Sequence, residues 1–181
     1  MRAFKIILIT LAVLMITVVV VGLFLPSSAV IERSITIQAS PDDIHPFVNS
    51  PRKWQEWTIW NTKKDETLEF SYEGEESGVG AIQTWTSKAS SSGRLEVTSS
   101  DPATGIGYTT SFKDDPESHS GTILYEKDGE GTRVTWTFEL NIGMSIPGRI
   151  LVFFFKDTMI ETFDDGLKEL AKVVEQSKKQ S

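Results

Sequence analysis

The segment from Thr67 to Asn141 constrains the fold more than any other, because it consists of six strand-like stretches in direct succession. They are "TLEFSYEG", "GAIQTWTS", "GRLEVTSS", "IGYTTSFK", "SGTILYEKD" and "GTRVTWTFELN". Apolar and polar residues alternate within them, as in strands with one buried face. The separators are short and rich in Gly, Asp, Pro and Ser, which favours hairpins over helical crossovers. We therefore predict an antiparallel meander with one strongly aromatic face.

A long helix, amphipathic throughout, is predicted after this meander, over about residues 150–176. At 100° per residue its apolar side holds Val152, Phe153, Met159, Ile160, Phe163, Leu167, Leu170 and Val174. Its acidic side is interpreted as a solvated face, not as a catalytic pair of carboxylates, and includes Asp157, Glu161, Asp164 and Asp165. Neither the apolar side nor the aromatic face of the sheet can remain wet, so the helix is expected to lie on the sheet.

One strand and two short helices are predicted before the meander. The stretch "AVIERSITIQ" alternates in the manner of a half-buried strand. Ser40, which is followed by Pro41 and two aspartates, is a predicted N-cap of the first helix. The second helix is predicted to contain Trp54 and Trp57 on one face, where they form a structural plug. The order of elements is therefore β-α-α-β6-α.

Five stretches in this order resemble the SRPBCC superfamily, in particular its polyketide cyclase/dehydrase and lipid-transport branch, and the birch-pollen-allergen fold. They are "RSITIQASPDDIHPFV", "PRKWQEWTIWN", "GVGAIQTW", "GTRVTWTFEL" and "FDDGLKELAKVVE". The resemblance implies an α+β helix-grip domain, in which an antiparallel sheet wraps around a long C-terminal helix and leaves an apolar cavity. It implies no single activity, since members bind hydrophobic ligands, cyclise rings or make regulatory contacts.

An uncharged run from Ile6 to Leu25 is long enough for about 30 Å of helix and one crossing of a bilayer. Arg2 and Lys5 precede the run, so we expect the amino terminus in the cytoplasm and the domain on the extracytoplasmic side. The run exceeds the h-region of a normal signal peptide, which favours a retained single-pass anchor. The alternative is secretion after cleavage near Ala29.

The chain is accordingly divided into three parts. Residues 1–28 form the cytoplasmic stub and the transmembrane anchor, or an uncleaved signal. Residues 29–177 form the ligand-binding domain, and residues 178–181 are a polar tail.

Charge and composition exclude several function classes. After residue 28 the chain holds 25 acidic and 16 basic residues, because two of its 18 basic residues precede that point. This net charge of −9 disfavours nucleic-acid binding. The absence of cysteine excludes disulfides, thiolate zinc sites and lipoprotein acylation. The two histidines, His45 and His119, are expected at the surface, and no catalytic residue, metal ligand or cofactor site is predicted.

Large apolar residues that phase together on the inferred concave side are the predicted cavity lining: Phe70, Tyr72, Trp85, Tyr108, Phe112, Trp136, Phe138, Met159 and Phe163. Trp60 is a predicted mouth residue. Lys156 falls on the apolar side of the long helix, where it either extends to the cavity rim or meets the carboxylate of a ligand. Arg33 shares the parity of its apolar neighbours and has the same two interpretations.

Three functions are compatible with this sequence. A membrane-tethered, non-catalytic domain that binds a lipid-like or aromatic small molecule is favoured, because no acid/base pair is evident among the cavity residues. The first alternative is a polyketide cyclase or dehydratase. The second is a module that docks a protein partner beside the membrane.

Overall fold

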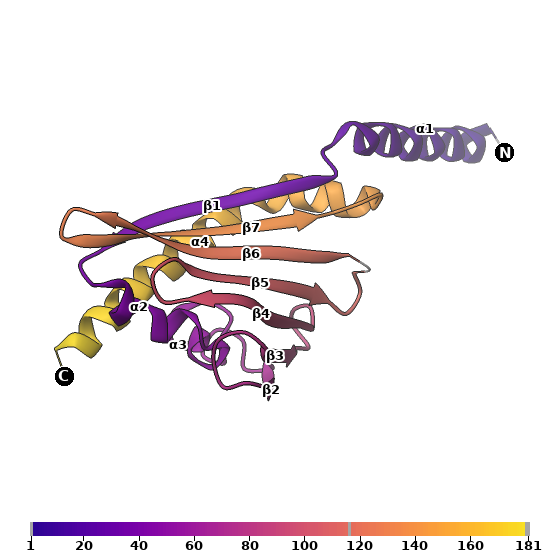
Figure 1. Cartoon of the computed structure of the whole chain (residues 1–181). Helices are drawn as coiled ribbons and strands as arrows, with labels where there is room; N and C mark the ends of the chain where they lie inside the picture. Colours follow the sequence, from indigo (N-terminus) through magenta and orange to yellow (C-terminus); the bar gives the residue numbers. More distant parts are fainter. Residues whose placement is uncertain (1, 116, 180–181) are drawn as a thin grey trace.

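The structure is a computed structural model and describes residues 2–115 and 117–179. A seven-stranded sheet curves around one long helix, and a separate helix at the amino terminus projects away from this domain (Figure 1). The helical elements are α1 (Arg2–Phe24), α2 (Pro41–Val48), η1 (Pro51–Lys53), α3 (Trp54–Trp57) and α4 (Ile146–Lys178). The strands are β1 (Ser28–Ile37), β2 (Glu69–Gly74), β3 (Ala81–Thr86), β4 (Gly93–Asp101), β5 (Gly105–Phe112), β6 (Ser118–Asp128) and β7 (Gly131–Asn141). The predicted helix-grip fold is confirmed.

All neighbouring strands pair antiparallel, in the order β1-β7-β6-β5-β4-β3-β2. The six strands of the meander follow one another through short turns, as their separators predict. The first strand joins the last, with Ile31 opposite Phe138 and Ile35 opposite Val134. Strands β1 and β7 are thus hydrogen-bonded neighbours although they lie far apart in the sequence. Together they form the part of the sheet beneath α4.

Helix α2 begins at the predicted N-cap. Ser40 Oγ accepts a hydrogen bond from the Asp43 backbone N–H, and the Asp43 carboxylate accepts one from the Ser40 N–H. This reciprocal capping satisfies two donors that a helix start leaves free. The Asp43 carboxylate also accepts from the Ser40 hydroxyl at 2.8 Å, and this bond, together with the one from the Ser40 N–H, lowers the pKa of the Asp43 carboxyl. Helix α2 is thus anchored locally before it packs on α4.

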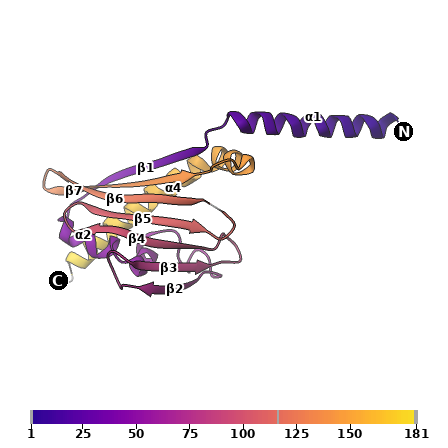
Figure 2. The ribbon, with the colours of Figure 1, turned by 45° about the vertical axis from the view of Figure 1, so that its right-hand side comes forward.

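Helix α4 is longer than predicted and is buried along only part of its length. It holds 33 residues and begins with Ser145 as N-cap, whose Oγ accepts from the Gly148 N–H. Phe163, Leu167, Leu170 and Val174 are buried in the core. Phe153, however, is 63% exposed, so its predicted contact with the sheet is wrong. The first turns of α4 lie instead beside α1 (Figure 2).

Asp164 and Arg33 also differ from prediction. Arg33 Nε lies 2.6 Å from Asp164 Oδ1, and the pair links β1 to α4. Asp164 therefore does not belong to a freely solvated acidic face, and Arg33 has a partner within the protein. Both side chains are partly exposed, so water screens the pair and it contributes little to stability.

Both histidines are buried, contrary to the predicted surface positions. His45 is 6% exposed, and its ring nitrogens lie 3.3 Å from Tyr125 Oη and 3.1 Å from Ser100 Oγ. Burial lowers the pKa of His45. His119 is 2% exposed, because β6 begins at Ser118 and turns this side chain inward.

Candidate ligand-binding site

The concave face is the side of the sheet that carries α3 and α4, and its centre is filled by aromatic rings. Trp54 and Trp57 are buried there, as the plug prediction requires. Their indole N–H groups donate to backbone carbonyls of α2, Trp54 to Val48 at 2.8 Å and Trp57 to Phe47 at 3.1 Å. The two short helices are thereby fastened to each other over the sheet.

Four predicted lining residues complete this packed centre, which we call the core cluster: Tyr108, Trp136, Phe138 and Phe163. The rings of Trp136 and Phe163 stack with centroids 4.1 Å apart. The Trp136 indole N–H donates to Tyr108 Oη at 2.7 Å. The rings pack against one another, and the Trp136 N–H has its hydrogen-bond acceptor within the cluster. The core cluster is therefore part of the hydrophobic core in this conformation.

Tyr108 fits into the cluster because its neighbour on β6 is Gly121. A Cβ atom at Gly121 would lie 2.2 Å from Tyr108 Cζ, which no real contact permits. Burial raises the pKa of Tyr108, and the hydrogen bond from Trp136 does not offset this effect. The Tyr108 hydroxyl therefore stays neutral, and it joins the core cluster through its hydrogen bond from Trp136.

The concave face is less completely covered at the other end of the strands. Phe70, Trp85 and Phe112 are only partly buried and share one transverse register, in which Gly93 stands between Trp85 and Phe112. The Trp85 ring lies over Gly93, where a Cβ atom would come within 2.5 Å of it, and reaches Phe112 at 6.0 Å between centroids. We call Phe70, Trp85 and Phe112 the open aromatic row.

A second row of the concave face is polar and buried. Pairing aligns Gln83, Leu95, Thr110 and His119 across strands β3 to β6. Gln83 is 7% exposed, and its Oε1 has no hydrogen-bond partner among the described residues. We call Gln83, Thr110 and His119 the polar row. It lies one register step inward from the open aromatic row.

His119 has one defined hydrogen bond. Its Nδ1 accepts from the Asn141 backbone N–H at 3.2 Å, so a neutral ring carries its proton on Nε2. Nε2 lies 3.3 Å from Asp115 Oδ2, without the alignment of a hydrogen bond. The His119 ring lies next to the Phe112 ring, at 5.3 Å between centroids, and its buried Nε2 faces the Asp115 carboxylate.

The remaining predicted site residues lie in different surroundings. The Tyr72 hydroxyl accepts from Gln55 Nε2, and the Arg52 guanidinium lies 4.1 Å from its ring centroid, so η1 and α3 hold this side chain. Met159 is partly buried against the core. Trp60 is 42% exposed and touches the edges of Trp136 and Phe163, at the rim of the core cluster.

Lys156 is exposed on the first half of α4, and its side chain extends to water. Its apolar neighbours on the helix, Val152 and Met159, are partly buried against the core. Thr110 and His119 were not predicted as site residues. The period-two alternation of His119 with Gly121, Ile123 and Tyr125 is the signal that points to an inward position.

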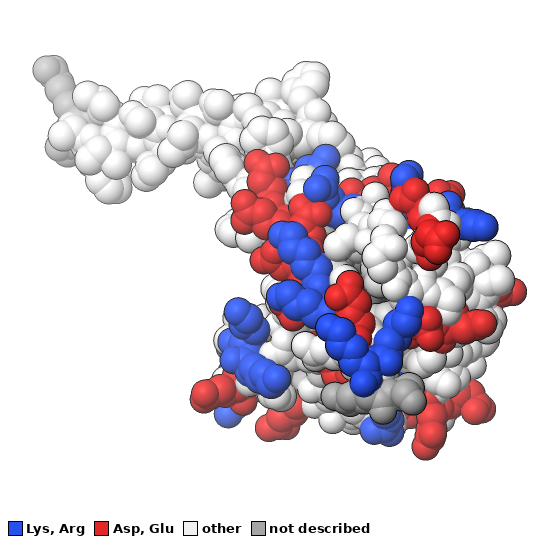
Figure 3. Space-filling view, turned by 90° about the vertical axis from the view of Figure 1, so that its left-hand side faces the viewer, with Lys and Arg blue, Asp and Glu red and all other residues white. Residues whose placement is uncertain are grey.

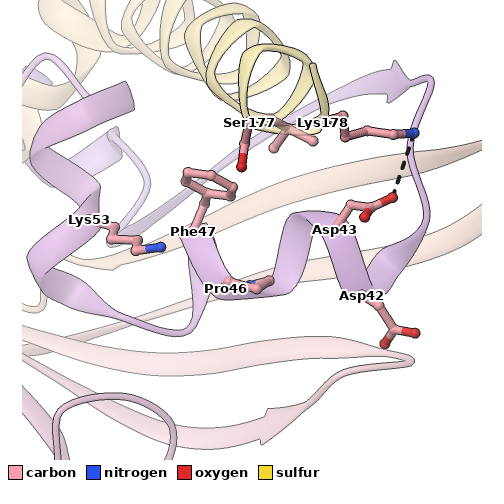
Figure 4. A pocket seen from close by; sticks show the side chains of 8 residues that line it. Asp42, Asp43, Pro46, Phe47, Lys53, Ser177 and Lys178 are labelled. Atoms are coloured by element: carbon pink, nitrogen blue, oxygen red, sulfur yellow. Dashed lines mark ion pairs between the residues drawn. The ribbon is translucent and has the colours of Figure 1, made fainter. Parts of the chain in front are cut away.

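The surface of the described residues includes two hollows of different character. One, of about 360 Å³, lies between α2 and the end of α4 and is lined by Asp42, Asp43, Pro46, Phe47, Lys53, Val174, Ser177 and Lys178 (Figure 4). Lys178 Nζ lies 3.6 Å from Asp43 Oδ2, and Lys53 Nζ lies 4.6 Å from the Phe47 ring centroid. Such a charged lining suits no apolar ligand.

The other hollow, of about 830 Å³, lies between α1 and α4 and is lined by Val18, Val19, Ile146, Pro147, Ile150, Leu151, Phe154 and Phe155. Its lining residues are all apolar. Neither hollow contains a metal-binding constellation, and within residues 2–115 and 117–179 no three His, Asp or Glu side chains converge as metal ligands would.

The sequence profile of the polyketide cyclase/dehydrase and lipid transport family matches residues 28–175. The chain belongs to this family. No curated protein matched the sequence. The matched segment begins at β1 and ends within α4, so it comprises the domain without α1.

Solved structures show the same fold at low sequence identity. TTHA0849 from Thermus thermophilus has a TM-score of 0.61 and 18% identity over 82% of this chain and 99% of its own. Ara h 8.0201 has a TM-score of 0.53 and 15% identity, over 82% and 99%. DynU16, from the dynemicin biosynthetic locus, has a TM-score of 0.56 and 15% identity, over 82% of this chain and 48% of its own.

Proposed function

We propose that this protein binds a hydrophobic small molecule, lipid-like or aromatic, at the open aromatic row of a membrane-tethered extracytoplasmic domain. The observation that carries the proposal is the contrast within one face of the sheet. The residues of the core cluster are buried and pack against one another, whereas the rings of Phe70, Trp85 and Phe112 are partly exposed. An apolar ligand laid on these rings removes both surfaces from water.

The polar row supports a ligand with at least one hydrogen-bond donor. A buried carbonyl oxygen without a partner costs about 1–3 kcal/mol, so Gln83 Oε1 favours a hydroxyl or amide of the ligand. The preferred ligand therefore has an apolar body and a polar group that reaches one register step inward.

The expected affinity is moderate. Burial of roughly 200–300 Å² of apolar ligand surface is worth about 5–8 kcal/mol, before the cost of immobilisation is subtracted. This supports micromolar binding at most.

The tether is proposed from α1. The segment Ala3–Phe24 is long and apolar enough to cross a bilayer, with a mean hydropathy of 3.1, and only 6% of it is buried within the protein. An exposed apolar helix of this length requires a nonaqueous neighbour. With the amino terminus in the cytoplasm, the domain lies on the extracytoplasmic side. Residues 1–28 are proposed as the stub and anchor, 29–177 as the binding domain and 178–181 as the polar tail.

The test is a titration of the full chain, in nanodiscs, with a fatty acid, a sterol and a polycyclic aromatic compound, monitored by tryptophan fluorescence. We expect saturable quenching by at least one class, and about tenfold or greater weakening by Phe112→Ala, since loss of a well-buried ring costs more than 1.4 kcal/mol. Leu124→Ala, at a partly exposed position of β6, is the matched control. Absence of binding below about millimolar concentration, or equal binding by Phe112→Ala, contradicts the proposal.

A cyclase or dehydratase is the second candidate, and the buried imidazole of His119 beside the Asp115 carboxylate is the observation that favours it. A positioned imidazole can donate a proton to a substrate oxygen and later recover it. Turnover of a polyketide-like chain that disappears in His119→Gln, while ligand binding persists, supports this activity. Binding without turnover supports the non-catalytic function.

A further inference from the structure

The first half of α4 exposes a continuous apolar surface. Met144, just before the helix, is 81% exposed, and Leu151, Phe153, Phe154 and Phe155 are 58%, 63%, 72% and 52% exposed. Patches of this kind are uncommon on monomeric soluble proteins and mark contact with a partner or a membrane.

The charge pattern of this half favours lipid over a polar partner. Arg149 is its only charged residue before Lys156, and Arg149 is 9% exposed. Charged residues resume at Lys156 and Asp157, so the change in polarity along the helix is abrupt. On the face shown in Figure 3, many charged side chains lie on the domain, whereas none is visible along the projecting stalk of α1.

Arg149 joins the start of α4 to the end of α1. Its Nη1 donates to the carbonyls of Leu23 at 3.4 Å and Leu25 at 3.2 Å, and its Nη2 donates to the Gly143 carbonyl at 2.7 Å. The last carbonyls of a helix lack partners and carry partial negative charge, which a cation stabilises. Arg149, a residue of α4, thus caps the carboxyl-terminal end of α1.

Close packing accompanies this cap. A Cβ atom at Gly22 would lie 2.4 Å from Ile146 Cγ2, so glycine permits α1 and α4 to touch. The contact and the cap together hold α1 in one direction relative to the domain (Figure 2).

The orientation of α1 places the apolar first half of α4 beside the last turns of α1. The hollow between them is lined by Val18 and Val19 on one side and by Phe154 and Phe155 on the other. Val18 precedes Phe24 by six residues, or about 9 Å of helix rise. If α1 spans the bilayer, its neighbours on α4 lie within the outer leaflet.

The open aromatic row lies at the same end of the domain. Phe112 touches the ring of His119, and His119 accepts from the N–H of Asn141, the last residue of β7. Asn141 pairs with Ser28 at the start of β1, directly after α1. The uncovered end of the concave face is therefore the end nearest α1 (Figure 1).

We propose that Met144 and the first half of α4 insert into the outer leaflet beside α1, so that the open aromatic row faces the bilayer and exchanges its ligand with the lipid phase. This inference rests on the proposed anchor. Lys156 then marks the water boundary, where its ammonium group reaches the lipid phosphates. The ligand need not cross water, which favours lipid-like molecules.

Spin labels on the full chain in phosphatidylcholine vesicles test the insertion, because the chain contains no native cysteine. Phe154→Cys and Met144→Cys report the proposed contact, and Leu14→Cys, 58% exposed on α1, reports the anchor. Leu124→Cys, 45% exposed on β6, is the control for an exposed apolar position on the domain. The measurement is the ratio of collisions with oxygen, which enters lipid, to collisions with a water-soluble nickel chelate.

We expect the ratio at positions 154 and 144 to approach the value at 14 and to lie severalfold above the value at 124. A lipid-like ratio at 14 with water-like ratios at 154 and 144 overturns the insertion and leaves the anchor intact. Water-like ratios at all four positions overturn the anchor and the insertion together. Strong dipolar broadening between labels at position 154 assigns this surface to a second copy of the chain and also overturns the insertion.

Discussion

The two halves of α4 form one continuous helix but lie in opposite environments. Leu170 in the second half is fully buried, whereas Phe154 in the first half is 72% exposed. Helix α4 contacts β1, α2, α3 and α1 along its length. Its second half holds most of its core residues, whereas Ile146 and Ile150 in its first half lie beside Gly22 of α1. Exposed hydrophobic side chains are stabilised by burial, but the sequence of a helix does not determine which neighbouring element buries them.

The two halves also differ in their residue patterns. From Met159 onward, apolar residues recur at helical spacing with charges between them, which leaves a single apolar stripe. From Ile150 to Phe155 every residue is apolar, so no side of the helix is distinguished. A helix that is apolar all round belongs in a protein interior or in lipid. The run "ILVFFF" is therefore consistent with the proposed insertion into lipid, and averaging over the whole helix conceals it.

Truncation of one side chain in each half should produce the largest difference in stability. Leu170→Ala removes a core side chain and should lower the free energy of unfolding by about 2–5 kcal/mol. Phe154→Ala should change it by about 0.5 kcal/mol or less in detergent, because no protein cover is lost. Urea unfolding followed by tryptophan fluorescence measures both. Comparable losses in the two variants would mean that the first half is also packed against protein.

Removal of the cap on α1 should have the next largest effect. Arg149→Met deletes hydrogen bonds from a charged group, each worth about 1.5–3 kcal/mol, and frees the junction of α1 and α4. We expect a broader distribution of distances between spin labels on Leu14 and Leu124. Arg133→Met, which alters an exposed arginine of β7, is the control. An unchanged distribution would show that Gly22 packing alone orients α1.

The ion pair that ties the packed half to β1 should contribute less. Arg33→Met and Asp164→Asn should each destabilise the protein only slightly, and the double variant should show little additional loss. High salt should reduce the coupling, since both groups are partly exposed. Thermal unfolding of the four proteins completes the double-mutant cycle, and fully additive losses would show that the pair has no coupling.

The smallest expected effect is a dependence on pH at the packed end of the domain. Burial lowers the folded-state pKa of His45, so the unfolded chain binds more protons as the pH falls below about 6.5. Stability should therefore decrease from about pH 8 to about pH 5, with a smaller decrease in His45→Gln. Urea midpoints at several pH values test this, and equal slopes in both proteins would assign the decrease to other groups.

Most of the fold was predictable because its signals are local. The strand boundaries follow from alternation and turn residues, and the start of α2 follows from Ser40 and Asp43. The candidate site was only partly predictable. Strand parity identified the inward aromatic residues, but Tyr108 and Trp136 satisfy each other in the core, while Trp85 and Phe112 remain partly open. The alternation of residues along a strand cannot distinguish buried from partly exposed inward residues, because their burial depends on where α4 lies over the sheet.

The sequence by itself determined the antiparallel meander, the helix-grip order and the apolar amino-terminal helix, since hydrophobic period, turn chemistry and run length act between near neighbours. Tertiary structure alone decided that His45 and His119 are buried, that Arg33 meets Asp164, and that Arg149 caps α1. These outcomes join residues far apart in the chain, and they depend on strand register and on the path of α4. A local pattern specifies which side of an element is apolar, whereas its partner is selected only when the elements pack.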